Sequence, residues 1–226
     1  MPSSSKRKLV IGNWKMNPDS SEEAKRIIKE VKKAASNLTK TDVVACPPFV
    51  FAHLVLGRSG SVALGAQDVF AEERGSHTGE VSALMLRDIG AEYVIIGHSE
   101  RRAMGETDEV VARKEIRASL AKVTKKYVKN IVMAYEPIWA IGAKDAMDPA
   151  VVQEMMIFIR KVLSDMYGQS EVASLPILYG GSVNFRNAGD ILEKGDVDGF
   201  LVGRESVNPP GFVELLKVVD GGVARE

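Results

Sequence analysis

The sequence lacks the features that mark secreted, membrane-spanning and nucleic-acid-binding proteins. Its one cysteine, Cys46, cannot form an internal disulfide and fits a reducing cytoplasm. No apolar run approaches the roughly 20 residues of a membrane-spanning helix, and no apolar signal core follows the polar, basic residues 1–8. Thirty acidic residues balance thirty basic ones. We therefore expect a cytoplasmic protein whose partners include neither nucleic acid nor a membrane.

The sequence also lacks a low-complexity linker, so we expect residues 1–226 to form one domain. Short β-branched runs alternate with longer amphipathic segments. The seven runs are Leu9–Ile11, Val43–Ala45, Val62–Gly65, Tyr93–Ile96, Ile131–Ala134, Ile177–Tyr179 and Gly199–Val202. Each is short and bounded by polar or turn residues, as in parallel strands covered on both faces. This alternation predicts an α/β fold, either an open doubly wound sheet or a closed barrel.

Three of the intervening segments have clear helical patterns. The segment Ser20 to Glu23 has the spacing of a capping box, and an apolar stripe follows it. Asp148 and Pro149 fit the N-cap and first position of another helix. The segment Thr107–Tyr127 contains neither glycine nor proline, and it is the longest predicted helix.

Polar residues follow nearly every predicted strand, at the edge where parallel α/β proteins bind ligands. After the first strand, Asn13 and Lys15 can direct an amide and an ammonium group into a cleft. After the fourth strand, His98 precedes a predicted helix start, where the helix dipole favours a neutral imidazole that still donates one hydrogen bond. Glu100, two residues later, can pair internally and orient neighbouring loops.

Tyr135, Glu136 and Pro137 follow the fifth predicted strand. A carboxylate at the end of an apolar strand loses hydration, which favours a general base. The following segment, Ile138–Met147, is first apolar and then contains glycine, alanine and charged residues, as expected for a hinged lid.

Two glycine-containing motifs follow the last two strands. Gly180 and Gly181 permit close backbone approach, and we expect Ser182 to open a helix whose N–H groups hold an anion. Gly203 and Arg204 end the seventh strand. Such glycine-containing ends on the last two strands of a barrel commonly form a phosphate site.

Taken in chain order, these motifs resemble the triosephosphate isomerase family over about residues 8–219. The motif from Tyr135 to Gly142, Tyr-Glu-Pro-Ile-Trp-Ala-Ile-Gly, carries most of the resemblance. Gly-His-Ser-Glu-Arg-Arg around His98 and Tyr-Gly-Gly-Ser-Val from Tyr179 support it. The resemblance implies a TIM-type (β/α) barrel that interconverts dihydroxyacetone phosphate and glyceraldehyde 3-phosphate, a reaction of glycolysis and gluconeogenesis.

The resemblance also implies the residue roles. Glu136 would remove the proton beside the carbonyl, while neutral His98 and Asn13 stabilise the enediolate oxygens and Lys15 adds positive charge. Such a Glu base with a neutral His is a worked example of this very family in general accounts of catalysis. The phosphate would lie on the backbone N–H groups of Gly142, Ser182, Gly203 and Arg204. The lid, Ile138, Trp139, Ala140, Ile141, Gly142 and Ala143, would close over the substrate, and no metal or organic cofactor is implied.

The loop Gly75–Glu80 resembles the loop through which members of the family form homodimers. The chain is therefore expected to be a homodimer, with a monomer as the alternative. His53 and His77 are interpreted as structural residues.

The chain departs from the family between His98 and Glu136, which are only 38 positions apart. A typical barrel has roughly 250 residues, so about one βα unit is missing. A closed seven-stranded barrel would bring the two side chains about one strand spacing nearer, ~4.8 Å. A gapped barrel would preserve their distance and leave two strand edges exposed. The prediction is a seven-stranded barrel that is incomplete or gapped between these strands.

Arg204 stands where the family usually has a second glycine, and it would be strained if that position needs a positive φ. Three functions are compatible with the motifs. The first is a working isomerase, the second is a catalytically impaired or inactive barrel that still binds phosphate, and the third is another phosphate-binding barrel enzyme. The motifs around Glu136 and His98 argue against the third.

Overall fold

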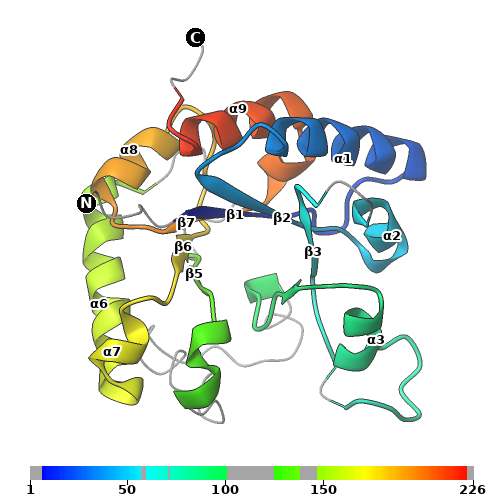
Figure 1. The fold of residues 1–226 in the computed structure, drawn as a ribbon, viewed down its shortest axis with the longest axis horizontal. Coiled ribbons are helices and arrows are strands. Elements are labelled where there is room, and N and C mark those ends of the chain that lie inside the picture. Colours follow the sequence, from blue (N-terminus) through cyan, green and yellow to red (C-terminus); the bar gives the residue numbers. More distant parts are fainter. Residues whose placement is uncertain (1–6, 57–59, 71, 101–124, 138–146, 223–226) are drawn as a thin grey trace. The chain divides into compact units, whose positions relative to one another are not determined.

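Seven parallel strands alternate with helices in a computed structural model of the chain (Figure 1). The structure describes residues 7–56, 60–70, 72–100, 125–137 and 147–222. The strands are β1 (Lys8–Asn13), β2 (Thr41–Cys46), β3 (Ala63–Ala66), β4 (Tyr93–Val94), β5 (Met133–Tyr135), β6 (Ile177–Tyr179) and β7 (Gly199–Val202). Each corresponds to a predicted strand, so the α/β prediction is confirmed. The strand order is β4-β3-β2-β1-β7-β6-β5.

Helices connect most of these strands. The α-helices are α1 (Ser21–Ala35), α2 (Ala52–Val55), α3 (Ala83–Asp88), α6 (Pro149–Tyr167), α7 (Gln169–Val172), α8 (Ala188–Lys194) and α9 (Pro209–Val219). Short 3-10 helices are η1 (Phe49–Phe51), η2 (Lys125–Asn130) and η4 (Arg204–Val207). Most of the predicted helix Thr107–Tyr127 lies outside the described residues, and its described end, from Lys125, belongs to η2.

The chain divides into two compact units, which are described separately. Unit 1 contains residues 1–96, 183–188 and 201–226, and unit 2 contains residues 97–182 and 189–200. In unit 1, β4, β3, β2 and β1 are neighbours in the order, and in unit 2, β5 pairs with β6 and β6 with the start of β7. Among the described residues, β4 pairs only with β3 and β5 only with β6, so these two are the end strands of the order.

Both end strands are more exposed than the sequence predicted. Val94 in β4 is 39% exposed, and Ile96 just beyond it is 75% exposed. Ala134 in β5 is also exposed. The prediction of strands covered on both faces therefore does not hold for these two strands; the segments that follow them, residues 101–124 and 138–146, lie outside the described residues. The incomplete TIM-type barrel is the fold class that these strands support.

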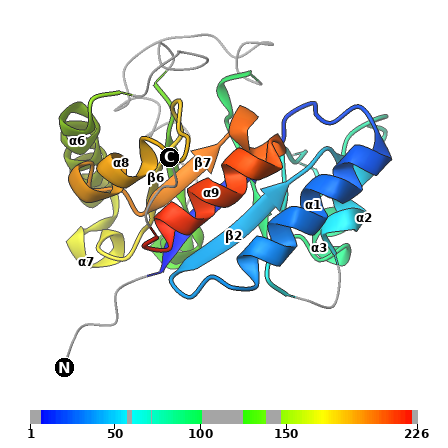
Figure 2. The ribbon, with the colours of Figure 1, turned by 90° about the horizontal axis from the view of Figure 1, so that it is seen from above.

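The capping signals positioned two helices as predicted. The Ser20 hydroxyl accepts the Glu23 N–H at 3.3 Å and begins α1. Asp148 accepts the Ala150 N–H at 2.8 Å and begins α6, with Pro149 in its first turn. Within unit 1, α1 and α9 lie side by side over β1 and β2 (Figures 1 and 2). No helix formed by the described residues is long and apolar enough to cross a bilayer.

Asp220, at the end of α9, fastens this helix to the start of β2. Its carboxylate accepts the Lys40 N–H at 2.6 Å and the Thr39 N–H at 3.0 Å. Partial burial alone would raise the pKa of Asp220, but these hydrogen bonds outweigh it and hold the pKa below its ordinary value of 3.8. The charged carboxylate therefore stabilises the folded state.

We expect Asp220→Asn to destabilise the protein by about 1 kcal/mol at pH 7, because partial exposure screens these charged hydrogen bonds. A carboxyl group whose pKa is lower in the folded state stabilises the protein at pH values above its pKa in the unfolded chain. This stabilisation is lost as the pH falls through its pKa in the folded protein. The difference between wild type and variant should therefore shrink below pH 3.8. Urea unfolding at pH 7 and pH 3 measures it, with exposed Asp190→Asn as the control. An equal difference at both pH values would contradict the assignment.

Cys46 lies fully buried at the end of β2, facing Gly65 of β3. A methyl group on Gly65 would overlap Cys46 Sγ, so the absence of a side chain there makes room for the thiol. Burial raises the pKa of Cys46 from 9.0 to about 12.

This raised pKa predicts a loss of stability at alkaline pH. Between pH 9.0 and about 12 the unfolded chain loses the Cys46 proton while the folded protein keeps it, so stability falls as the pH rises. The loss approaches about 1.4 kcal/mol per pH unit. Cys46→Ala should reduce this slope when urea unfolding is compared at pH 8 and pH 10.5. Burial also raises the pKa of Tyr167. Tyr167→Phe therefore tests how much of the slope that remains in Cys46→Ala comes from this tyrosine. An unchanged slope in Cys46→Ala would refute the prediction.

In unit 2, an ion pair joins α6 to the start of β7. Arg160 donates to Asp198 at 2.9 Å and to the Leu175 carbonyl at 3.3 Å. Asp198 also accepts the Ile177 N–H at 2.9 Å. The pair therefore fixes the N-terminal ends of β6 and β7, whereas the predicted site residues follow the C-terminal ends of strands.

Candidate active site

Two groups of residues, which include the predicted catalytic residues, follow strand ends, one in each unit. The His98 cluster, in unit 2, consists of His98, Ser99, Glu100 and Glu136. The Lys15 turn, in unit 1, consists of Asn13, Trp14 and Lys15. The structure brings the members of each group together.

The His98 cluster joins residues that follow β4 and β5. Glu136 comes directly after β5, and its side chain is 18% exposed. Its Oε2 accepts the Ser99 hydroxyl at 3.1 Å and lies 3.6 Å from His98 Nε2. The side chains of His98, Ser99 and Glu136 are therefore in direct contact or close to it. Ser99 was not predicted as a site residue, although it lies inside the Gly-His-Ser-Glu motif.

The backbone selects one neutral form of His98. The Glu100 N–H donates to His98 Nδ1 at 3.1 Å, at the point where Ser99 and Glu100 begin helical backbone. Nδ1 therefore accepts, and the proton of the neutral ring lies on Nε2. Nε2 is buried and has no hydrogen-bond partner among the described residues. A buried donor without a partner is costly, and a ligand oxygen can satisfy it.

Residues at the end of β6, the strand next to β5, lie beside Glu136. The Gly180 N–H donates to the Tyr135 carbonyl at 2.8 Å, and a methyl group on Gly180 would lie 3.4 Å from Glu136 Cβ. Tyr179 is fully buried, and its hydroxyl accepts the Met147 N–H at 3.2 Å. Burial raises the pKa of Tyr179, and the Met147 hydrogen bond partly offsets this. Tyr179 therefore fixes the end of the predicted lid segment, a role that its sequence position did not indicate.

The Lys15 turn has an unusual backbone. Lys15 has a φ of +53°, and apart from glycine only Asp196 shares a positive φ among the described residues. The Lys15 N–H donates to Asn13 Oδ1 at 3.0 Å. Gln67, after β3, donates through Nε2 to the carbonyls of Lys15 and Cys46, both at 2.8 Å. A strained non-glycine residue held by such contacts is characteristic of functional sites.

The four predicted phosphate-binding residues fall in different places. Gly142 and the lid residues Ile138–Ala143 lie outside the described residues. Ser182 belongs to unit 2, and Gly203 and Arg204 belong to unit 1. A methyl group on Gly203 would lie 3.5 Å from Lys15 Cε, so the lysine stem passes beside this strand end.

Two expectations about these residues need correction. Ser182 does not open a helix, because α8 begins only at Ala188. The Asn184 side chain accepts the Arg186 N–H at 2.8 Å and forms a turn that delays the helix. Arg204 is not strained, because it opens η4 and is absent from the positive-φ residues.

The loop Gly75–Glu80 is exposed throughout. His77 Nε2 lies 3.2 Å from Glu72 Oε2, and its ring packs on Phe70 at 4.5 Å between centroids. The Phe70 N–H donates to the Val81 carbonyl at 2.9 Å and closes the base of the loop. His77 therefore shapes the loop from within, as the structural interpretation predicted.

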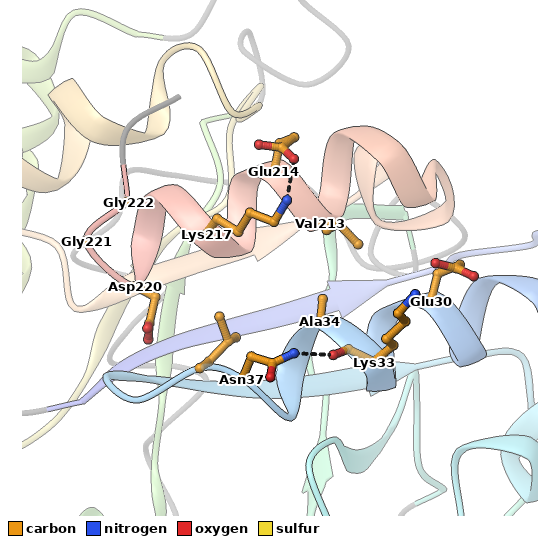
Figure 3. Close-up of a pocket in the computed structure, with 11 residues that line it drawn as sticks. Glu30, Lys33, Ala34, Asn37, Val213, Glu214, Lys217, Asp220, Gly221 and Gly222 are labelled. Carbon is orange, nitrogen blue, oxygen red and sulfur yellow. Dashed lines mark hydrogen bonds and ion pairs between the residues drawn. The ribbon is translucent and has the colours of Figure 1, made fainter. Parts of the chain in front are cut away.

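The groove between α1 and α9, about 670 Å³ in volume, contains no predicted site residue (Figure 3). Its lining carries both charges, including Glu30, Lys33 and the ion pair of Glu214 with Lys217. The described residues form no group of three side chains suited to a metal ion. The groove therefore lies apart from the described residues that the sequence predicts for catalysis.

Comparisons with known proteins agree with the motifs. The profile of the family described as Triosephosphate isomerase matches residues 8–118 and 111–219. The chain is 37% identical to the triosephosphate isomerase of Endomicrobium trichonymphae, with 94% of this chain and 98% of that protein aligned. It is 40% identical to that of Dehalococcoides mccartyi (92% and 96%) and 36% identical to that of Roseiflexus sp. strain RS-1 (92% and 96%).

The first of these alignments spans 248 positions, more than the 226 residues of the chain. The relative therefore has residues that this chain lacks. The two profile matches meet at residues 111–118, between His98 and Glu136. Both observations agree with a missing segment at this place in the chain.

Proposed function

Because the chain belongs to the triosephosphate isomerase family, we propose that it interconverts dihydroxyacetone phosphate and glyceraldehyde 3-phosphate by proton transfer through an enediolate. The observation that carries the proposal is the buried Nε2 of His98, which has no hydrogen-bond partner among the described residues and lies beside the Glu136 carboxylate. A hydrogen-bond donor for a carbonyl oxygen and a base for the carbon next to it are the two groups that this reaction needs. The proton transfer uses no metal or organic cofactor.

Glu136 is the proposed base. Its Oε2 is 3.6 Å from His98 Nε2, which leaves no room for a substrate carbon between the two atoms. Substrate binding therefore requires the carboxylate to leave the Ser99 hydroxyl and face the substrate. The Glu136 side chain is 18% exposed, so water has limited access to the proposed base.

His98 and Asn13 are the proposed donors to the developing oxyanion. Nδ1 of His98 accepts a backbone N–H, so Nε2 donates to the substrate oxygen. Oδ1 of Asn13 accepts the Lys15 N–H, which leaves the Nδ2 hydrogens of the amide for the other oxygen. Lys15 contributes positive charge where negative charge develops.

The proposed phosphate site uses the backbone N–H groups of Gly142, Ser182, Gly203 and Arg204. The Lys15 stem beside Gly203 supports the inclusion of that strand end. The lid Ile138–Ala143 is proposed to close over the bound substrate, which protects the enediolate from water.

A coupled assay of triose phosphate interconversion by the purified chain tests the proposal. Turnover in both directions is expected. The second candidate is an impaired barrel that retains phosphate binding, and the shortened interval between His98 and Glu136 is the observation in its favour. Undetectable turnover with intact binding of a phosphate analogue would refute the working isomerase and support this candidate.

The proposal includes one domain over residues 1–226, since β7 contributes residues to both compact units. It also includes a cytoplasmic location, for which the single cysteine is the support.

A homodimer through the loop Gly75–Glu80 completes the proposal. Large apolar side chains lie exposed at the ends of neighbouring strands of unit 1. Met16 follows β1 and is 94% exposed, and Val50 follows β2 and is 71% exposed. Met85, just beyond the loop, is 57% exposed. Exposed apolar residues grouped in this way are typical of protein interfaces.

We expect Met85→Glu to convert the dimer to monomer, because it places a charge in an apolar interface. Sedimentation velocity at matched concentrations measures the change. Ile157→Glu, at an equally exposed apolar residue of α6 (59%), should leave the dimer intact. A wild-type monomer, or a dimer that survives Met85→Glu, would contradict this interface.

A further inference from the structure

We propose that Ser206 is a positioning residue that couples the phosphate-binding strand end at Gly203 to the catalytic Lys15 turn. The inference rests on the proposed roles of Asn13 and Gly203. Ser206 itself touches no substrate in this proposal and acts through the backbone.

Ser206 is a fully buried polar residue that contacts both groups. It is 0% exposed and lies in η4, directly after β7. Its hydroxyl is 2.7 Å from the Gly203 carbonyl and 3.2 Å from the Asn13 carbonyl. Its backbone N–H also donates to the Gly203 carbonyl at 2.9 Å. One buried hydroxyl therefore links the ends of β7 and β1.

Close packing fixes the place of this hydroxyl. A methyl group on Gly12 would lie 3.1 Å from Ser206 Cβ and 3.4 Å from the Phe212 ring. η4 therefore approaches β1 so closely that a side chain at Gly12 would be tightly packed against it. Replacement of Ser206 with alanine keeps Cβ and this packing and removes only the hydroxyl.

The contacts continue from Asn13 back to Gly203. The Asn13 side chain accepts the Lys15 N–H, and the Lys15 stem passes beside Gly203. Ser206 completes this set of contacts, because its hydroxyl lies close to the backbone carbonyls at both strand ends. An anion held by the Gly203 N–H therefore fixes the same backbone that orients the Asn13 amide and the Lys15 ammonium group.

Steady-state kinetics and a double-mutant cycle test the proposal. Ser206→Ala should lower kcat about tenfold and raise KM severalfold, because loss of the positioning hydroxyl displaces the Asn13 amide and the Lys15 ammonium group from the substrate. On the background of Asn13→Ala, the same substitution should have little further effect on kcat, because the positioned group is gone. Asp220→Asn serves as the control, because it weakens unit 1 at the start of β2, away from the strand ends that carry the site residues. This variant should change thermal stability and leave kcat and KM unaltered.

A purely structural serine gives a different pattern. Lowered thermal stability with wild-type kinetic constants would overturn the proposal, and so would effects of Ser206→Ala and Asn13→Ala that multiply. Calorimetric titration with inorganic phosphate separates this inference from the proposed reaction. If wild type shows no turnover, the reaction is refuted, and Ser206→Ala must still weaken phosphate binding severalfold. Unchanged phosphate affinity would overturn the coupling whatever the activity.

Discussion

Glu136→Gln is expected to lower kcat by about 10²–10⁴-fold, the usual contribution of a general base. Glutamine retains the shape of the side chain and can still accept the Ser99 hydroxyl, so the geometry of the cluster should persist. What disappears is the ability to take a proton. Since the phosphate contacts are unaffected, KM for glyceraldehyde 3-phosphate should change little.

Glu193→Gln provides the control, because this residue lies exposed on α8 and away from the cluster. Its kinetic constants should equal those of wild type. Full activity of Glu136→Gln would require a different base and would remove Glu136 from the mechanism. Glu136→Asp adds a graded test, since displacement of the carboxylate by about 1 Å should itself cost on the order of 10²-fold.

His98→Ala is expected to lower kcat by about 10²–10³-fold, the effect of losing one donor to a developing oxyanion. His98→Gln should recover part of this loss, because its amide N–H can reach the place of Nε2. Kinetic assays on both variants measure the difference. His53→Ala, at an exposed histidine on α2, serves as the control.

Equal activities of His98→Ala and wild type would show that the buried Nε2 serves packing only. Equal losses in His98→Ala and His98→Gln would instead show that the donor alone is insufficient. The Glu100 N–H to Nδ1 contact would then matter as well, since only an imidazole accepts it.

Local signals in the sequence predicted the parts of the fold that depend on neighbouring residues. The capping box at Ser20 and the Asp148–Pro149 pair begin helices because their side chains reach backbone groups two or three residues away. Ser182 shows the limit of this reasoning. A serine after two glycines suits a helix start, but Asn184 forms a competing turn and postpones α8.

The positions of His98 and Glu136 were predictable because each follows a strand, and parallel strands end at one edge. The short distance between their side chains was not predictable, because the closed barrel and the gapped barrel, both compatible with the shortened chain, imply different distances. The contacts that hold the site residues in place could not be predicted from the sequence either. Tyr179 with Met147 and Ser206 with Asn13 join positions 32 and 193 residues apart, and only the folded backbone brings them together.

The composition of unit 1 has a consequence for how the protein is made. Its helices α1 and α9 and its strand neighbours β1 and β7 come from opposite ends of the chain. During synthesis β2 is therefore available to β1 early, whereas β7 and α9 follow more than 150 residues later. Contacts of such long sequence separation slow folding and prolong exposure of apolar surface. The side of β1 that pairs with β7 is thus the part of unit 1 that is completed late.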